Sequence, residues 1–391
     1  MTAVVTSIAR ARQSARKRAD ATMANHRVSV FIVAIVGLLV VIGLGATLSA
    51  SSVKALDTDL ERIYFFKRQA MWVAIGIVVM VAAAKTPYQW YAKFAPWIYL
   101  VSVAGLVAVL FIGNEAGGAT RWIEIGPVGF QPSELSKLGL PVMLASILTK
   151  KRKLLRKFGH FIVPVALTIG LTSTLLILEP DFGTALVIVV AGMAVIVASA
   201  TPLRFVGVTV LAGIVGAMML AVSQPYRLAR ITSFLAADPD VLGTGWQLNQ
   251  SLNALGTGGL FGIGLGQSRA RWLYLPNAHT DFIFAIIGEE MGFAGAVFVL
   301  TLLALLGLLG AVTALRARDS FGRLLAVGIT AWLCAQALVN VGGVVGALPI
   351  SGIALPFVSY GGTAIVMAMA GAGVLINIAV QGRAGGMPTI R

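Results

Sequence analysis

Asp281 is the residue of this sequence best placed for acid–base chemistry. It lies in H-T-D-F-I-F-A-I-I-G-E-E at 279–290, directly before an apolar run that predicts a helix. A carboxylate at such an interface of lowered dielectric has a raised pKa, which suits it to take a proton from a hydroxyl group. Glu289, two turns further along the predicted helix, is a second functional candidate because acids are rare inside membrane helices. Alternatively, Thr280 or Asp281 caps the helix.

A candidate cation lies in G-A-T-R-W-I-E-I-G-P-V-G-F-Q-P-S-E-L-S-K-L at 118–138. Glu134 and Lys137 are spaced i, i+3 on a predicted short helix, so they share a face and can pair. In the functional interpretation, Glu134 holds Lys137 against an anionic lipid headgroup. In the structural interpretation, Ser133 is the N-cap and Glu134 interacts with the helix dipole. The sequence leaves both open.

Two further carboxylates lie in L-E-P-D-F-G-T at 178–184, a tight turn between two predicted helices. Pro180 sets the turn, and Asp181 could simply cap the second helix. Glu179 and Asp181 could instead hold a substrate sugar or a divalent cation, because carboxylate oxygens suit magnesium and manganese.

A glycine-rich segment, G-A-L-P-I-S-G-I-A-L-P-F-V-S-Y-G-G-T at 346–363, leads into the last predicted helix. Backbone N–H groups at Gly361 and Gly362 could bind a phosphate at the helix start. Glycines of this kind equally serve close helix packing in membranes. Ser359, just before them, is included among the candidate substrate-binding residues.

Long apolar segments must position these groups. The chain of 391 residues is 58% hydrophobic and 12% charged, with a mean hydropathy of +0.90, against roughly 25% charged in soluble domains. Many apolar runs approach or exceed the roughly 18 residues that predict a membrane span. The predicted fold is an all-α polytopic membrane protein of about ten transmembrane helices, near 28–50, 69–84, 94–113, 135–149, 161–178, 183–200, 204–222, 283–314, 324–348 and 362–381.

The charges predict the topology. Most of the 30 lysines and arginines fall in short segments that an even number of spans places on the cytoplasmic side, as the positive-inside rule requires, with both termini inside. All acidic residues except Asp20 and Asp319 then fall on the outer side. A net charge of +15 distributed in this way does not indicate nucleic-acid binding.

The predicted domain organisation is simple. A basic cytoplasmic tail (1–27) precedes one membrane domain (28–381), and a short cytoplasmic tail (382–391) follows it. The first apolar run is too long for a signal-peptide core of about 7–15 residues. A large outer loop, 223–282, contains Trp246 and Trp272 and is expected to form short interfacial helices over the bundle.

Several kinds of site are not indicated. There is no G-x-x-x-x-G-K-[ST] nucleotide motif, and the histidines His26, His160 and His279 are too dispersed for a zinc site. Cys334 is the single cysteine, so no internal disulfide forms.

The chain resembles the SEDS family of bacteria, which includes FtsW, RodA and SpoVE. Four separated motifs carry the resemblance: R-W-I-x-I-G-P-x-G-F-Q-P-S-E-x-x-K, E-P-D-F-G-T, H-T-D-F-I-F-A-I-I-G-E-E and L-P-F-V-S-Y-G-G. F-F-K-R-Q at 65–69 matches too, so the resemblance covers residues 28 to 381. The segments 226–235 and 243–251 look closer to FtsW than to RodA, whereas Asn277 stands where many relatives have an acid.

The resemblance implies a peptidoglycan glycosyltransferase that polymerises lipid II on the outer face of the bacterial cytoplasmic membrane. It further implies a class B penicillin-binding protein as partner, other division proteins nearby, and a place at the division septum. By motif position, Asp281 would be the essential carboxylate. The implied substrate-binding residues are Lys137, Glu134, Arg121, Asp181, Glu179, Glu289, His279, Ser359 and Gly361.

In the expected reaction, Asp281 takes the proton of the attacking 4-hydroxyl while polyprenyl diphosphate leaves. Lys137, Arg121 or a magnesium or manganese ion held by Asp281, Asp181 or Glu179 would stabilise the diphosphate. Two rival functions remain open at the level of sequence. A lipid II flippase would fit the helices and the acids, and a non-catalytic division scaffold would need no Asp281.

Overall fold

The computed structural model describes residues 2–57, 63–116, 119–126, 128–222, 245–270, 275 and 278–382. The described chain is mostly helical. In chain order, its helical elements are α1 (Thr2–Asp57), α2 (Tyr64–Lys85), α3 (Tyr88–Ile112), α4 (Pro132–Lys150), the 3-10 turn η1 (Arg152–Leu154), α5 (Phe158–Val165), the π-helical turn η2 (Ala166–Gly170), α6 (Leu171–Leu178), α7 (Phe182–Ala198), α8 (Leu203–Val222), α10 (Trp246–Gly258), α11 (Ile283–Arg316), α12 (Ser320–Val344) and α13 (Gly362–Val380).

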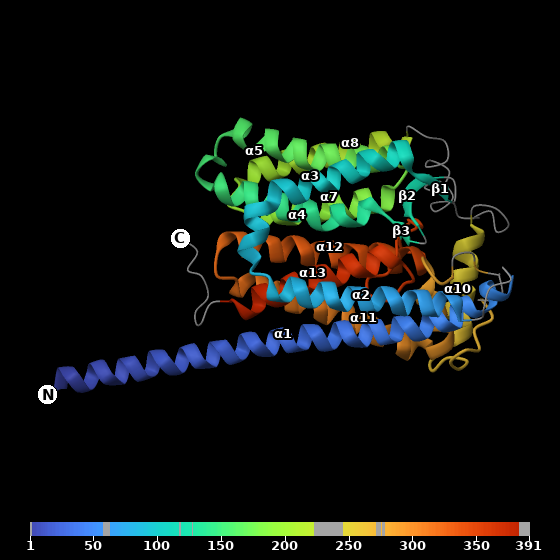
Figure 1. The fold of residues 1–391 in the computed structure, drawn as a ribbon, viewed down its shortest axis with the longest axis horizontal. Helices are drawn as coiled ribbons and strands as arrows, with labels where there is room; N and C mark the ends of the chain where they lie inside the picture. Colours follow the sequence, from blue (N-terminus) through green and yellow to red (C-terminus); the bar gives the residue numbers. More distant parts are fainter. Residues whose placement is uncertain are drawn as a thin grey trace.

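The long helices lie side by side along one axis (Figure 1). α1 begins and α13 ends at one end of this bundle, while α10 and a small β-sheet lie at the opposite end, here called the sheet end (Figure 1). α12 contacts α11 and α13 on one side and α4 and α7 on the other. Most of the helices run from one end of the bundle to the other. A residue at the start or end of such a helix therefore lies at one of these two ends.

The described residues contain 7 helical segments that are long and apolar enough to cross a membrane: Met23–Ser51, Tyr64–Lys85, Tyr88–Ile112, Phe158–Leu178, Ile283–Arg316, Ser320–Val344 and Gly362–Val380. Shorter apolar helices occupy Phe182–Ala198 and Leu203–Gly216. Each apolar segment predicted from the sequence therefore coincides with a helix, and the chain is an integral membrane protein.

The segment predicted as one helix at 161–178 is α5, η2 and α6 in succession. Pro164 has no backbone N–H and therefore disrupts the regular hydrogen bonding within the helix, which accounts for a π-helical turn just after it. The Tyr99 hydroxyl donates a 2.9 Å hydrogen bond to the carbonyl of Thr168 inside this turn.

A three-stranded antiparallel sheet corrects the all-α prediction. Its strands are β1 (Asn114–Ala116), β2 (Ala119–Ile125) and β3 (Val128–Phe130), in the order β1-β2-β3. The sequence T-R-W-I-E-I has the alternation of a strand, and Gly126, with φ 63°, begins the turn between β2 and β3. The sheet lies directly before α4 and fixes where that helix begins.

α11 is two helices that meet at Gly292, whose φ of 68° and ψ of −168° are not helical. The backbone groups freed by this break pair with the segment after α10. Ile263 N–H donates to the Glu289 carbonyl at 3.0 Å, and Phe293 N–H donates to the Gly259 carbonyl at 2.8 Å. A broken helix in a membrane protein needs such pairing, because unsatisfied backbone groups in lipid are costly. Glu289 thus lies on the short stretch of α11 that precedes the break.

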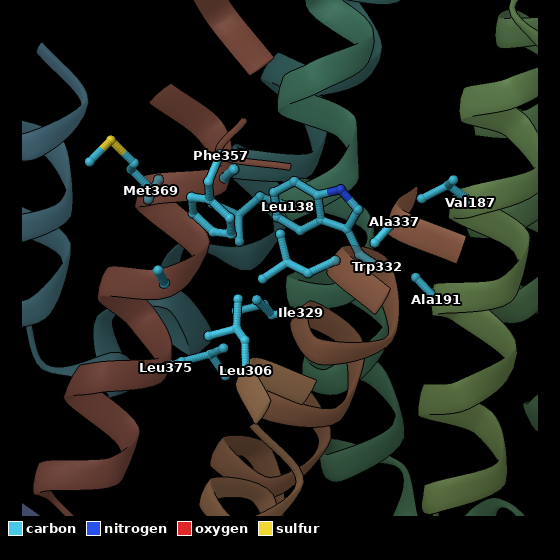
Figure 2. Packing of buried hydrophobic residues seen from close by; sticks show 14 of the residues in the cluster. Leu138, Val187, Ala191, Leu306, Ile329, Trp332, Ala337, Phe357, Met369 and Leu375 are labelled. Atoms are coloured by element: carbon cyan, nitrogen blue, oxygen red, sulfur yellow. The ribbon is translucent and has the colours of Figure 1, made fainter. Parts of the chain in front are cut away.

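The core is centred on α12 and α13. Trp332 packs among apolar side chains that include Leu138, Ile329 and Phe357 (Figure 2). In the most apolar window of α13, 78% of residues are buried, against 22% in α2 and α3. α12 and α13 are therefore held by protein on most sides, and their polar residues face other protein groups rather than lipid.

The outer loop and the tails are partly described. α10 confirms that the loop predicted at 223–282 forms a short helix, which begins at Trp246. Residues 223–244, Trp272 and Asn277 lie outside the described residues, as do 383–391 of the predicted C-terminal tail. The predicted N-terminal tail is helical from Thr2 and continues into the first membrane helix as α1.

Candidate active site

Asp281 lies half-buried in the turn that precedes α11. Its backbone carbonyl accepts a 2.8 Å hydrogen bond from Asn340 Nδ2 on α12, and the same nitrogen donates to the Ile353 carbonyl at 2.7 Å. Its carboxylate lies beside Gly352, where an added Cβ would be 3.7 Å from Asp281 Oδ2. Gly352 has φ 69°, a conformation that favours glycine. Asp281 is thus fixed between α12 and the 351–355 loop without being buried.

His279 supports the turn that carries Asp281. Its ring is 5% exposed and packs beside Phe65 and Tyr360, with centroid distances of 5.3 and 5.5 Å. Tyr360 N–H donates to the His279 carbonyl at 3.0 Å. The His279 ring thus joins α2 to the turn, and contact of His279 with substrate stays a prediction.

Gln69 of α2 holds the glycine-rich segment before α13. Its Nε2 donates to the Ser359 carbonyl at 3.1 Å, and its Oε1 accepts the Gly361 N–H at 3.3 Å. Ser359 Oγ accepts the Leu355 N–H at 2.7 Å. The N–H of Gly361 and the hydroxyl oxygen of Ser359 are thus engaged within the protein. The engagement of the Gly361 N–H with Gln69 counts against its availability to a phosphate, while substrate binding by Ser359 stays a prediction.

Glu134 and Lys137 form the ion pair expected from their spacing. Lys137 Nζ lies 2.6 Å from Glu134 Oε1, and the two side chains are 1% and 6% exposed. Lys137 also donates to Gln336 Oε1 at 3.2 Å. The helix begins at Pro132 with Gln131 as its N-cap, so Ser133 is not the cap. The pairing is confirmed, and the functional role of the cation stays a prediction.

Arg121 of β2 lies against the turn between α6 and α7. It donates through Nε to the Glu179 carbonyl at 3.2 Å and through Nη2 to the Pro180 carbonyl. Asp181 caps α7 by accepting the Thr184 N–H at 3.2 Å, and it also accepts a 3.3 Å hydrogen bond from Ser133 Oγ. Arg121 and Asp181 therefore hold the sheet, α4 and α7 together.

Glu179 is a buried carboxylate in the same turn. It is 0% exposed, and neither of its oxygens has a hydrogen-bond partner in the described chain. Burial, followed by the negative charge of Asp181, raises the pKa of Glu179 to about 8, although Arg121 opposes the shift. Glu179 therefore holds a proton at neutral pH.

The 351–355 loop lies between the two groups of candidate residues. The Ala354 carbonyl accepts a 2.8 Å hydrogen bond from Gln336 Nε2, which links the loop to the Lys137 pair. A Cβ on Gly183 of α7 would be 2.9 Å from the Ser351 carbonyl oxygen, so α7 contacts the loop closely. The loop thus brings the predicted residues of α4, α7 and α11 together at the sheet end.

Glu289 is engaged outside this arrangement. It is 2% exposed and accepts hydrogen bonds from Ser268 Oγ, from Arg269 N–H at 3.0 Å and from Ala270 N–H at 3.2 Å. Its neighbour Glu290 accepts from Ser49 Oγ and from Ser268 N–H. Glu289 therefore anchors the segment after α10, and its role in substrate binding stays a prediction.

Within the described part of the chain, the acids do not form a preassembled metal centre. Among the described residues, no group of three or more His, Cys, Asp and Glu is arranged to hold an ion. Asp281, Asp181 or Glu179 could therefore supply one or two ligands to an ion, but the described residues do not supply a complete coordination shell.

Gln336 and Asn340, which no sequence motif indicated, contact both groups of candidates. They are spaced i, i+4 in an otherwise apolar helix and are 3% and 4% exposed. Polar residues inside a membrane helix usually face other protein groups, and that signal could have identified them.

Comparisons with known proteins agree with this arrangement. The family model of FtsW, RodA and SpoVE, described as "Cell cycle protein", matches residues 29–384. The probable peptidoglycan glycosyltransferase FtsW of Geobacter sp. (strain M18) is 38% identical over 348 residues, 88% of this chain and 95% of that protein. The stage V sporulation protein E of Bacillus subtilis (strain 168) is 40% identical over 358 residues, 90% of this chain and 97% of that protein.

Solved structures show the same fold. A chain from a structure titled "Structural coordination of polymerization and crosslinking by a peptidoglycan synthase complex" matches with a TM-score of 0.72 and 29% identity, covering 90% of this chain and 96% of that one. The rod shape determining protein RodA of Thermus thermophilus matches with a TM-score of 0.64 and 28% identity, covering 89% and 95%.

Proposed function

Because this chain belongs to the FtsW, RodA and SpoVE family, we propose that it is a peptidoglycan glycosyltransferase that polymerises lipid II. The observation that carries the proposal is the placement of Asp281, half-buried at the sheet end and fixed through Asn340. The relatives named as probable peptidoglycan glycosyltransferases match nearly the whole chain, which supports the same activity here.

In the proposed reaction, the 4-hydroxyl of one lipid-linked disaccharide attacks the anomeric carbon of another. Asp281 takes the hydroxyl proton as the new carbon–oxygen bond forms. The bond from the anomeric carbon to the diphosphate breaks, and the electron pair leaves with the polyprenyl diphosphate. General-base catalysis of this kind contributes about 10²–10⁴-fold, so Asp281 would supply a large share of the rate.

Lys137 would influence the reaction through its charge, because its side chain is buried and does not face solvent. Its ammonium group is buried against Glu134 and Gln336, and Gln336 holds the loop beside Asp281. Fixed charges in a site shielded from water stabilise developing charge without reorganising. We therefore assign Lys137 a positioning role that includes the electrostatics of the site.

A magnesium or manganese ion would be bound together with the substrate. Such ions often use only one or two protein carboxylates and complete their shell with substrate phosphates and water. Asp281 or Asp181 fits this role better than Glu179, because the raised pKa of Glu179 keeps it protonated at neutral pH. The ion would neutralise the leaving diphosphate.

The topology follows from the charges. Asp319 caps α12 at the end opposite the sheet, whereas Glu134, Asp181 and Asp281 begin α4, α7 and α11 at the sheet end. We assign the sheet end to the outer face of the cytoplasmic membrane, with ten spans and both termini inside. A class B penicillin-binding protein would be the partner, together with other division proteins at the septum, by analogy with the FtsW relatives and the matching synthase complex.

The test is polymerisation of lipid II by the purified full-length chain in lipid nanodiscs, with glycan strands resolved on a gel. Wild type should form strands, and Asp281→Asn should lose most of the activity. Glu124→Gln is the matched control, because Glu124 is an exposed carboxylate on β2 at the same end. Full activity of Asp281→Asn would refute the base assignment. Headgroup transfer across liposomes without strand formation would instead indicate a flippase, and neither activity would indicate a scaffold.

A further inference from the structure

The motif F-F-K-R-Q at 65–69 lies beside Asp281 but has no part in the reaction described above. Phe65 contacts the His279 ring, and Gln69 holds the segment before α13. Arg68, between them in sequence, is half-buried at the sheet end of α2. The first turns of α2 therefore place a cation close to the turn that carries Asp281.

Two phenols accompany Arg68. Its Nη1 donates to the Tyr64 hydroxyl at 3.2 Å. Phe65 packs edge-on against both phenol rings, at centroid distances of 5.4 Å to Tyr64 and 5.6 Å to Tyr360. Burial raises the pKa of the Tyr360 phenol, and the positive charge of Arg68 opposes that rise. Phe65 thus joins the Arg68–Tyr64 pair to Tyr360, and a guanidinium grouped with phenol hydroxyls is a donor set suited to phosphate oxygens.

An apolar cavity begins one residue before this group. It has a volume of about 580 Å³ and is lined on one side by Ile63 and by the face of α1 that carries Val41 and Gly45. The short helix before Gly292 and the segment after α10 add Ile287, Met291 and Leu265 to the lining. Its polar members are Ser49 and Glu290, which are hydrogen-bonded to each other. The volume is within the range of pockets that bind a ligand, about 300–1,000 Å³.

We propose that Arg68, Tyr64 and Tyr360 bind the diphosphate of a polyprenyl diphosphate, and that the cavity beside Ile63 receives the adjoining hydrocarbon chain. The proposal rests on the glycosyltransferase function and names the subsite for the lipid carrier of the donor. A cation with hydroxyl donors next to an apolar cavity matches a ligand whose charged head is joined directly to an apolar tail.

The other cations of the site are less suited to this role. Lys137 is 1% exposed and is engaged by Glu134 and Gln336. Arg121 donates to two backbone carbonyls of the turn before α7. Neither α4 nor the sheet contributes a residue to the cavity lining, whereas Ile63, which does, is the N-cap of the helix that carries Arg68.

The experiment measures binding of two ligands to the full-length chain in phosphatidylcholine nanodiscs. Geranyl diphosphate carries the diphosphate with a short chain, and a long-chain polyprenyl diphosphate carries the same head with a long one. Arg68→Gln should weaken both by about tenfold or more, because it removes a charge-assisted interaction. Lys93→Gln is the matched control, since Lys93 is a cation next to aromatic residues, over the rings of Trp90 and Phe94, but lies near the start of α3, at the opposite end.

The chain itself offers a matched pair of variants for the cavity. Gly37 and Gly45 are both exposed glycines of α1 with open space where a Cβ would be added, and only Gly45 is among the cavity-lining residues. Gly45→Phe should weaken binding of the long-chain ligand and leave geranyl diphosphate unchanged. Gly37→Phe should change neither.

Three results would overturn the proposal. They are wild-type affinity in Arg68→Gln, an equal loss in Lys93→Gln, and displacement of geranyl diphosphate by phosphatidylglycerol as readily as by polyprenyl diphosphate. Should Arg68→Gln fail to fold, Arg68→Lys and Tyr64→Phe replace it, and undiminished binding in both would count against the site in the same way. Arg68-dependent binding without lipid II polymerisation would refute the proposed function alone, whereas polymerisation with Arg68-independent binding would refute this subsite alone.

Discussion

Replacing Lys137 by methionine separates the structural value of the buried ion pair from its catalytic value. Methionine keeps the length and apolar stem of the side chain but removes the ammonium group 2.6 Å from Glu134 Oε1. Glu134 Oε2 already has no hydrogen-bond partner among the residues that the structure describes. Breaking a buried pair by removing one partner costs about 3–5 kcal/mol, whereas replacing both partners by apolar residues is often neutral or stabilising. Lys137→Met should therefore unfold at a clearly lower temperature, and Lys137→Met with Glu134→Leu should recover most of the loss.

Polymerisation should behave differently from stability. If the ammonium group contributes to the electrostatics of the site, lipid II turnover stays low in the double variant although its melting temperature has returned. Thermal unfolding in nanodiscs and strand formation at saturating lipid II measure the two properties on the same samples. Recovery of both stability and turnover in the double variant would refute the catalytic role, and an unchanged melting temperature in Lys137→Met would refute the energetic reasoning.

The other predictions concern single groups. Asp281→Asn should keep the fold and lower turnover by about 10²–10⁴-fold, measured as the initial rate of strand formation. Asn340→Leu removes the hydrogen bonds to the Asp281 and Ile353 carbonyls, and the buried Ile353 acceptor left unpaired costs about 1–3 kcal/mol. Its kcat should fall more than its KM rises. Glu179 has a pKa raised from 4.5 to about 8, so the folded chain holds a proton that the unfolded chain releases. Stability should fall as pH rises between 4.5 and 8, and denaturant titrations should show this dependence flattened in Glu179→Gln.

Local pattern predicted the helices well, because a membrane span is specified by its own length and composition. The same reasoning failed where distant segments decide the geometry. The break at Gly292 lies inside an apolar run and depends on pairing with 259–264. Glu289 was interpreted as a functional intramembrane acid, but its partners come from Ser268 and the following backbone, which no local pattern reveals.

The candidate site shows the same division. Spacing predicted the Glu134 and Lys137 pair correctly, since residues three apart on a helix are neighbours whatever surrounds them. The cap formed by Asp181 was equally local. The N–H of Gly361 was expected to be available to a phosphate, but it donates to Gln69, which is 292 residues away in sequence. The sequence could suggest which groups carry chemistry, but only tertiary contacts decide which of them remain accessible.

One face of α12 determines how the two halves of the site are related. Gln336 and Asn340 are one turn apart, and both donate to the loop beside Asp281, at the Ala354 and Ile353 carbonyls. Gln336 also accepts from Lys137, and Asn340 also donates to the Asp281 carbonyl. The proposed general base, Asp281, and the buried cation, Lys137, are therefore held by the same helical turn of a largely buried helix. Neither can shift relative to the other without breaking hydrogen bonds that α12 makes to both, which is the rigidity that electrostatic preorganisation requires.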